Sequence, residues 1–393
     1  MTALAALFWQ AASDVAIMVH CRNRRLPNER MSRPLHASIR THALHHNAEL
    51  IRSRAPHSRM LAMVKADAYG HGLETVVRAL PQADAFGVAA LSEARRIRAI
   101  GSTVPIVLMS GPDHAEDLAE LRQLSLACVI HHPDQVALLE QAPAGPPLHC
   151  WLKIDSGMHR LGIAPEDVHA IHARLSACAA VHPELVFMTH FASSDETDLH
   201  TRGGAMTLRQ LQLFEQVTAG LPGLRSLANS AAILDWPQTH ADWVRPGGAL
   251  YGMSVAAGKP GPDYGLQPVM QLDTRLLSVK TVRGGERVGY SSLWEAPEDM
   301  PIGIAAVGYG DGYPRLAPSG TPVLLEGQPV PLIGRVSMDM IALDLRERPQ
   351  ARVGDAVRLW GDGLPVDTVA AHCDTIGYAL TCAVTGRVPR VPG

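Results

Sequence analysis

The sequence has few cysteines and no close cysteine pair. Six cysteines are scattered over 393 residues, so no C-x-x-C spacing indicates a zinc site or a redox motif. The 19 histidines include only two doublets, His45-His46 and His131-His132, and neither has metal-ligand spacing. We therefore expect no metal. Isolated thiols in a large chain are typical of the reducing cytoplasm, where we expect this protein.

Concentrated charge of one sign is also missing. The formal net charge is -3, and the basic residues noted near the N-terminus are Arg22, Arg24 and Arg25. Binding to nucleic acid or to an anionic membrane surface needs a much denser basic patch. We expect neither partner, and a small molecule is the better default.

No long uninterrupted apolar run is present. Residues 3–19 are apolar, but Asp14 interrupts them and no basic segment precedes them. This fits neither an export signal nor a membrane helix. The domain-like pattern starts near Met31, so residues 1–30 are expected to be a poorly ordered extension or a misassigned start.

The first two thirds of the chain contain short apolar runs that alternate with helix-period segments such as Gly72–Leu80, Ser92–Ile100 and Pro133–Gln141. Alternation of this kind predicts βαβ units and a parallel sheet. Eight units favour an α/β protein with a (β/α)8 TIM barrel over residues 31–264, rather than an open sheet. The eight runs are Met60–Ala66, Ala85–Ala90, Pro105–Ser110, Leu126–His131, His149–Asp155, Leu185–Phe191, Arg225–Ser230 and Asp242–Leu250.

The pattern changes after about Gln267, where short strands follow one another with glycine turns. Leu272–Val282, Gly284-Gly285 and Glu286–Tyr290 indicate a strand, a tight turn and a strand. Later β-rich runs are interrupted by one expected helix, Asp367–His372. This pattern predicts a separate, mainly-β C-terminal domain over residues 265–393.

Lys65 stands at the end of the first predicted barrel strand, where barrel enzymes place their chemistry. Its neighbours Met63, Val64 and Ala66 are apolar. Partial desolvation of an ammonium lowers its pKa and makes the amine nucleophilic. By itself this pattern also fits a lysine whose head reaches solvent.

The segment Val64-Lys65-Ala66-Asp67-Ala68-Tyr69-Gly70-His71-Gly72 closely resembles the cofactor-lysine motif of bacterial alanine racemases, which are fold-type III pyridoxal-phosphate (PLP) enzymes. Asp67 stands where the family usually has asparagine. Further matching blocks extend the resemblance from about Pro34 to Val391. It implies that Lys65 carries PLP as an aldimine and is one of two acid/bases, and that Tyr69 hydrogen-bonds the cofactor phosphate.

Other barrel blocks also match family motifs. Lys153-Ile154-Asp155 through Arg160-Leu161-Gly162 implies that Arg160 contacts both the cofactor and the substrate carboxylate, while Lys153 corresponds to a commonly carbamylated lysine. Without the resemblance, Lys153 could simply pair with Asp155. The histidine expected to stack on the cofactor ring is His190, and the remaining cofactor-binding residues implied are Asn229, Ser230, Arg245, Gly247 and Gly248.

Arg245 carries a mechanistic implication, because its family counterpart faces the pyridine nitrogen of the cofactor. A guanidinium does not readily give up its proton, so that nitrogen stays unprotonated. The cofactor is then a weaker electron sink, which favours simple proton exchange over transamination.

The C-terminal domain contains the block Val288-Gly289-Tyr290-Ser291, which matches the family's second catalytic residue. The resemblance implies that Tyr290 acts in the site of a second chain, in a head-to-tail homodimer. Tyr309, Met338 and Asp339 would bind substrate or form the wall of the neighbouring chain's site. Many relatives have an entrance tyrosine where this chain has Gly386.

The resemblance therefore implies interconversion of L-alanine and D-alanine, either to supply D-alanine for peptidoglycan or to break alanine down. Two alternatives stay open at this point. Another fold-type III enzyme could be a decarboxylase, which is expected to carry glutamate in place of Arg245, or a racemase for bulkier or basic amino acids. A non-catalytic PLP carrier would resemble the barrel alone and would lack the domain that carries Tyr290.

Overall fold

The computed structural model describes residues 33–256 and 258–393, and residues 34–393 form one compact unit. The expected extension over residues 1–30 lies outside the described residues. Within the described ranges, no helix is both long enough and apolar enough to cross a bilayer.

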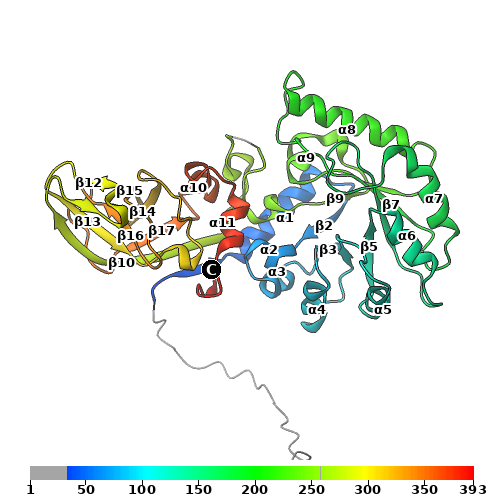
Figure 1. The fold of residues 1–393 in the computed structure, drawn as a ribbon, viewed down its shortest axis with the longest axis horizontal. Coiled ribbons are helices and arrows are strands. Elements are labelled where there is room, and N and C mark those ends of the chain that lie inside the picture. Colours follow the sequence, from blue (N-terminus) through cyan, green and yellow to red (C-terminus); the bar gives the residue numbers. More distant parts are fainter. Residues whose placement is uncertain (1–32, 257) are drawn as a thin grey trace, which may run out of the picture. The chain divides into compact units, whose positions relative to one another are not determined.

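A closed barrel of eight parallel strands forms the first part of this unit (Figure 1). Each of the eight predicted runs overlaps one of these strands, and the predicted barrel is confirmed. The strands are short, and each pairs in parallel with the next along the chain. The last strand, β9, pairs with the first, β2, and this pairing closes the barrel. They are β2 (Arg59–Met63), β3 (Ala85–Val88), β4 (Ile106–Leu108), β5 (Leu126–Ile130), β6 (Cys150–Lys153), β7 (Val186–Met188), β8 (Leu224–Ser226) and β9 (Trp243–Val244).

Helices surround the barrel because each connection between parallel strands must cross over the outside of the sheet (Figure 1). Apolar residues face the strands, as Ala94 and Ile97 do in α4. The three helical segments cited from the sequence correspond to α3, α4 and α6. The helices are α1 (Thr41–Arg54), α2 (Lys65–Tyr69), α3 (Leu73–Ala79), α4 (Leu91–Ala99), α5 (Ala115–Gln123), α6 (Pro133–Glu140), α7 (Val168–Ala177), α8 (Arg202–Thr218) and α9 (Ser230–Asp235).

The second part is a mainly antiparallel eight-stranded sheet, as the glycine-punctuated pattern predicted. Its strands from the C-terminal region are β10 (Met270–Val282), β13 (Met300–Ala305), β14 (Pro322–Leu325), β15 (Gln328–Ile333), β16 (Ile341–Asp344), β17 (Ala356–Trp360) and β18 (Arg390–Pro392). A small second sheet pairs β11 (Arg287–Val288) with β12 (Trp294–Glu295).

Three details of this second part differ from the sequence-based expectation. The run after the Gly284-Gly285 turn does not pair with β10; β11 pairs with β12, and β10 pairs instead with β13. The chain also forms two late helices rather than one, α10 (Val366–His372) and α11 (Gly377–Ala383). The eighth strand is β1 (His36–Ile39), which lies between β10 and β18 although it precedes the barrel in sequence. Four residues paired with strands more than 200 positions away leave no local signal.

Candidate active site

A cavity of about 720 Å³ opens at the carboxyl ends of the barrel strands. This is the end at which (β/α)8 barrels place their active sites. Every barrel residue that the sequence analysis selected lines this cavity. These residues are Lys65, Tyr69, Lys153, Arg160, His190, Asn229, Ser230, Arg245, Gly247 and Gly248.

Lys65 lies two residues beyond β2 and begins an unusual turn. The four residues that follow it, Ala66, Asp67, Ala68 and Tyr69, all have φ of 54°, which is the left-handed region. For residues other than glycine this conformation costs roughly 1–2 kcal/mol per residue. Surrounding contacts must therefore hold the turn that carries both Lys65 and Tyr69.

Two residues of α4, three positions apart on one face, supply such contacts. The Glu93 carboxylate accepts hydrogen bonds from the backbone N–H groups of Ala66 (2.6 Å) and Ala89 (2.9 Å). Asp67 accepts from the Leu73 N–H (3.1 Å) and from the Arg96 guanidinium (2.7 Å). Sequence reasoning missed Glu93 and Arg96, because an acid and a base on an exposed helix face look like ordinary surface charge.

The environment of Lys65 shifts its amine toward the neutral form. Burial lowers the pKa of the Lys65 amine, and the Arg160 guanidinium lowers it further. The Glu93 carboxylate acts in the opposite direction. The net lowering increases the fraction of free amine, which is the nucleophilic species.

The rest of the cavity lining includes several cationic groups. Burial lowers the pKa of Lys153 to about 8, helped by nearby Arg245, Arg160 and Lys65. Burial and the same positive groups hold the pKa of His190 well below its ordinary value, so its imidazole is neutral at pH 7. This excess of positive charge suits a ligand with several negative charges.

Arg245 is buried and fixed by protein acceptors. Its Nη1 donates to the Ser226 hydroxyl (2.7 Å), and its Nη2 donates to the carbonyl oxygens of Leu227 (3.0 Å) and Thr189. Burial lowers its pKa to about 10, which still leaves it protonated at neutral pH. The guanidinium is therefore a fixed positive charge at the end of β9.

Small residues shape a cradle at one end of the cavity. A Cβ added to Gly247 would lie 2.6 Å from the Tyr69 hydroxyl oxygen, and one added to Gly248 would lie 2.1 Å from that of Tyr378. The Ser230 hydroxyl accepts from the Gly247 N–H (2.8 Å). Glycine is thus required where two phenols approach the backbone closely. The cradle's hydroxyl and N–H groups have the chemistry that binds a phosphate.

Two residues in or beside the cradle differ from what the sequence analysis expected. Tyr378 comes from α11, the helix that the sequence analysis did not predict, and only its position in space marks it. Asn229 does line the cavity, but its side-chain oxygen already accepts from the Ala232 N–H (3.1 Å) and the Ser194 hydroxyl (2.8 Å). It therefore caps α9.

The selected residues of the β domain do not line this cavity within one chain, as far as the described residues show. Tyr290 is 68% exposed. The segments carrying Tyr309 and Met338 do come together, because the Gly310 N–H donates to the Met338 carbonyl (2.9 Å). Arg387 donates to Asp339 beside them. The structure thus groups Tyr309, Met338 and Asp339 on one surface, and none of them lines the barrel cavity.

Comparisons with known proteins agree with this architecture. The family model for the alanine racemase N-terminal domain matches residues 39–255, and that for the C-terminal domain matches residues 269–392. The chain is 50% identical over 355 residues to an alanine racemase of Nitrosococcus oceani, covering 90% of this chain and 98% of that protein. It is 48% identical to a biosynthetic alanine racemase of Salmonella typhimurium, covering 89% and 96%.

Solved structures agree as well. The crystal structure of the biosynthetic alanine racemase from Pseudomonas aeruginosa superposes with a TM-score of 0.88 at 46% identity, covering 92% of this chain and 99% of that one. An alanine racemase from Acinetobacter baumannii gives a TM-score of 0.86 at 37% identity, covering 92% of this chain and 100% of that one.

Proposed function

The chain belongs to the alanine racemase family, and we propose that it interconverts L-alanine and D-alanine with PLP by moving the α-proton between Lys65 and Tyr290 of two chains. The observation that carries this proposal is the barrel cavity. It combines the partly desolvated amine of Lys65, further cationic groups and a glycine cradle at the catalytic end of the barrel.

The cavity residues fit PLP. The cradle of Gly247, Gly248 and Ser230, with the hydroxyls of Tyr69 and Tyr378, would hold the phosphate. Arg245 would face the ring nitrogen, and His190 would stack on the ring. When bound, the cofactor supplies an electron sink that acidifies the proton on the alanine Cα.

Lys65 and Arg160 would have different roles toward the substrate. Arg160 binds the alanine carboxylate and thereby orients the Cα–H bond. The Lys65 Nζ would exchange the proton on the face that handles the D-enantiomer, and the lowered pKa of its amine increases the fraction present as free base.

Tyr290 would exchange the proton on the opposite face. Its exposure supports an assembly in which it is covered, since a base must lie within hydrogen-bonding reach of the proton it takes. We therefore propose a head-to-tail homodimer in which Tyr290, Tyr309, Met338 and Asp339 complete the neighbouring chain's cavity. Met338 is 52% exposed in the single chain, as an interface residue would be.

Lys153 is proposed to be carbamylated. Its pKa of about 8 leaves part of the amine neutral and able to attack CO2, releasing one proton and leaving a negative group beside Arg160 and Arg245. A crystal structure near pH 8 that shows an unmodified Lys153 would contradict this assignment.

Two broader proposals concern the role and the compartment. Relatives named as biosynthetic alanine racemases support a role in supplying D-alanine for peptidoglycan. The described cysteines are all free, including Cys128 and Cys150, whose sulfurs lie 4.0 Å apart. Free neighbouring thiols support a reducing compartment, the cytoplasm.

The decisive experiment compares the unaltered enzyme with Lys65→Ala. The variant should lose the visible absorbance of the bound cofactor together with L-to-D alanine conversion, because Lys65 is the amine proposed to carry the cofactor and to exchange the proton. Rates with alanine, serine, lysine and arginine then test the substrate. Retained conversion by Lys65→Ala, or a preference for a basic amino acid, would refute the proposal.

A further inference from the structure

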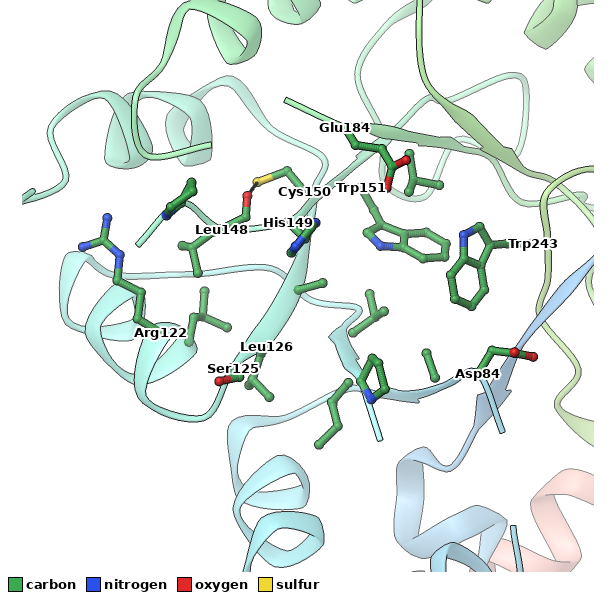
Figure 2. A pocket seen from close by; sticks show the side chains of 18 of the residues that line it. Asp84, Arg122, Ser125, Leu126, Leu148, His149, Cys150, Trp151, Glu184 and Trp243 are labelled. Carbon is green, nitrogen blue, oxygen red and sulfur yellow. Dashed lines mark hydrogen bonds between the residues drawn. The ribbon is translucent and has the colours of Figure 1, made fainter. Parts of the chain in front are cut away.

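The two ends of the barrel differ in how neighbouring strands are joined. At the amino ends a cavity of about 570 Å³ opens, and the indoles of Trp151 on β6 and Trp243 on β9 lie next to each other there (Figure 2), with ring centroids 5.4 Å apart. Beyond the carboxyl ends of β6 and β7, buried polar side chains form hydrogen bonds instead. One of these side chains holds the backbone of His190, which lines the candidate active site.

Gln210 is the centre of this hydrogen-bond network. It belongs to α8 and is fully buried. Its Nε2 donates to the carbonyl oxygen of His190 (3.0 Å) and to the hydroxyl of Ser156 (3.2 Å), and its Oε1 accepts from the N–H of Ala192 (2.9 Å). Because a carbonyl needs a donor and an N–H needs an acceptor, these partners fix the orientation of the amide.

The two backbone contacts of Gln210 hold the segment that follows β7. They lie on either side of Phe191, which is buried in the core. Among the described residues, none forms a hydrogen bond with the imidazole of His190 itself. The direction of that ring therefore depends on the backbone that carries it, and Gln210 holds this backbone.

A second branch of the network leads toward Arg245. The Thr189 hydroxyl donates to the carbonyl of Ile154 (3.0 Å), so the Ser156 hydroxyl, 2.7 Å away, donates to Thr189. Ser156 in turn accepts from Gln210, and both hydroxyl residues are buried. The backbone carbonyl of Thr189 accepts from the Arg245 guanidinium. Since buried polar groups are costly to leave unpaired, the network favours a single arrangement of these strand ends.

Glycine lets α8 approach this network closely. A Cβ added to Gly157 would lie 2.8 Å from the Met206 Cε and 3.4 Å from the Gln210 Cγ. Gly157 also has a φ of 137°, which side chains rarely adopt. At the other side of the helix start, a Cβ added to Gly204 would lie 2.2 Å from the carbonyl oxygen of Asp198. The close approach allows one glutamine side chain to reach the ends of both strands.

We propose that Gln210 is a positioning residue for alanine racemisation, an inference that rests on the function proposed above. Gln210 is not among the residues that line the cavity. It fixes the backbone of His190 and thereby directs the imidazole toward the cofactor ring. Through Ser156 and Thr189 it also supports the carbonyl that accepts from Arg245. A neutral amide suits this position, because it donates and accepts without adding charge beside the cationic groups of the cavity.

The test compares Gln210→Met with the unaltered holoenzyme, since methionine has a similar size but cannot form the three hydrogen bonds. We expect kcat per bound cofactor to fall about tenfold, because small displacements of positioning groups are costly in rate. The visible circular dichroism per bound cofactor should also change, since it depends on the groups packed around the ring. A loss of stability alone would lower the folded fraction and leave both values unchanged.

A second measurement needs neither cofactor nor activity. Crystal structures of the cofactor-free proteins should show the His190 imidazole turned in Gln210→Met relative to the unaltered chain. Exchange of the Ala192 amide hydrogen should be at least tenfold faster in the variant, because its acceptor is gone. If the unaltered enzyme converted no alanine, the proposed function would fail, and this measurement would still decide whether Gln210 holds His190.

Gln212→Met is the matched control, because Gln212 is exposed on the same helix, and it should behave as the unaltered enzyme. Ser156→Ala removes one contact of Gln210 and should lower kcat less than Gln210→Met. If Gln210→Met does not fold, Gln210→Asn applies the same test, since its amide is one methylene too short to reach His190. Unchanged kcat and circular dichroism per bound cofactor in a folded variant, or an unmoved His190 imidazole, would overturn the proposal.

Discussion

At the scale of single residues, burial sets the protonation states of groups in and near the barrel cavity. Arg245 stays charged although it is buried, because protein acceptors hold both of its terminal nitrogens. His71, in contrast, is held in its neutral form by burial. Its Nδ1 lies 3.0 Å from the carbonyl oxygens of Ala68 and Tyr69, so that nitrogen carries the proton, while Nε2 is buried without a partner among the described residues.

Replacing Arg245 tests the electrostatic part of the proposed mechanism. Arg245→Glu should lower racemisation on the order of 10²-fold, the loss typical of one fixed electrostatic contact, and should raise the share of transamination. Pyruvate formation per racemisation event measures that share. Arg245→Lys, which keeps the charge, is the control. An unchanged share in a folded Arg245→Glu variant would argue against this role.

His71 should make the protein sensitive to acid. Burial lowers its pKa to about 4 from an ordinary value of 6.5. Between these two values the unfolded chain binds a proton that the folded chain does not, so stability falls as the pH falls from about 6.5 to about 4. The loss is roughly 3 kcal/mol.

The measurement is urea unfolding at several pH values, compared between the unaltered protein and His71→Gln. The variant has no group that titrates at this position, so its stability curve should be flatter over the same pH range. Parallel curves would show that His71 does not carry the effect.

At the scale of elements, the turn after β2 is the feature that most needs support. Its four left-handed residues join the strand to the helices, and α4 holds them through Glu93 and Arg96. Arg96 is itself fixed by Glu74, with two contacts of 2.7 Å. Asp67, the departure from the family's asparagine, thus forms an ion pair that a neutral amide would not.

Removing Glu93 should let the turn relax. Glu93→Ala should lower kcat and cofactor retention by roughly 5- to 30-fold, if the lost contact stabilises the turn by about 1–2 kcal/mol. Ala66→Gly should restore part of this loss, since glycine adopts positive φ without strain and Ala66 is exposed.

The measurements are kcat, KM and cofactor absorbance for Glu93→Ala, Ala66→Gly and the double variant. Glu116→Ala on the first turn of α5 is the matched control and should behave as the unaltered enzyme. If Ala66→Gly gives no rescue in the Glu93→Ala background, Glu93 does not act through this turn.

At the scale of the whole molecule, the proposed site combines the barrel cavity of one chain with the β domain of another. Tyr290 does not line the cavity of its own chain among the described residues, and it lies exposed on the β domain together with Leu293 and Tyr309. A shared site makes a clear prediction for mixed chains.

Lys65→Ala and Tyr290→Phe chains should each be nearly inactive alone. Unfolded and refolded together in equal amounts, they should regain about a quarter of the unaltered activity, because half of the random dimers then contain one intact site of two. The assay is L-to-D alanine conversion before and after mixing. No recovery, with dimers formed, would mean that both residues serve the same chain's site.

Much of the fold and of the cavity could be predicted from the sequence, because the signals are local. Each barrel strand is a short apolar run, and Lys65, Arg160 and Arg245 stand within continuous motifs at strand ends. Local periodicity indicated α10 but not α11, whose seven residues carry no clear pattern of their own. The pairing of β11 with β12 was also missed, because a turn signal does not say which strands it joins.

The sequence by itself determined the strand–helix alternation and the residues that line the barrel cavity, since both depend on neighbours along the chain. Only the tertiary structure decided that β1 lies between β10 and β18, that Glu93 holds the turn after Lys65, and that Tyr378 reaches Gly248. It also decided that the amino end of the barrel is open. These features depend on how segments distant in sequence pack against one another. No local sequence pattern records how their side chains fill space.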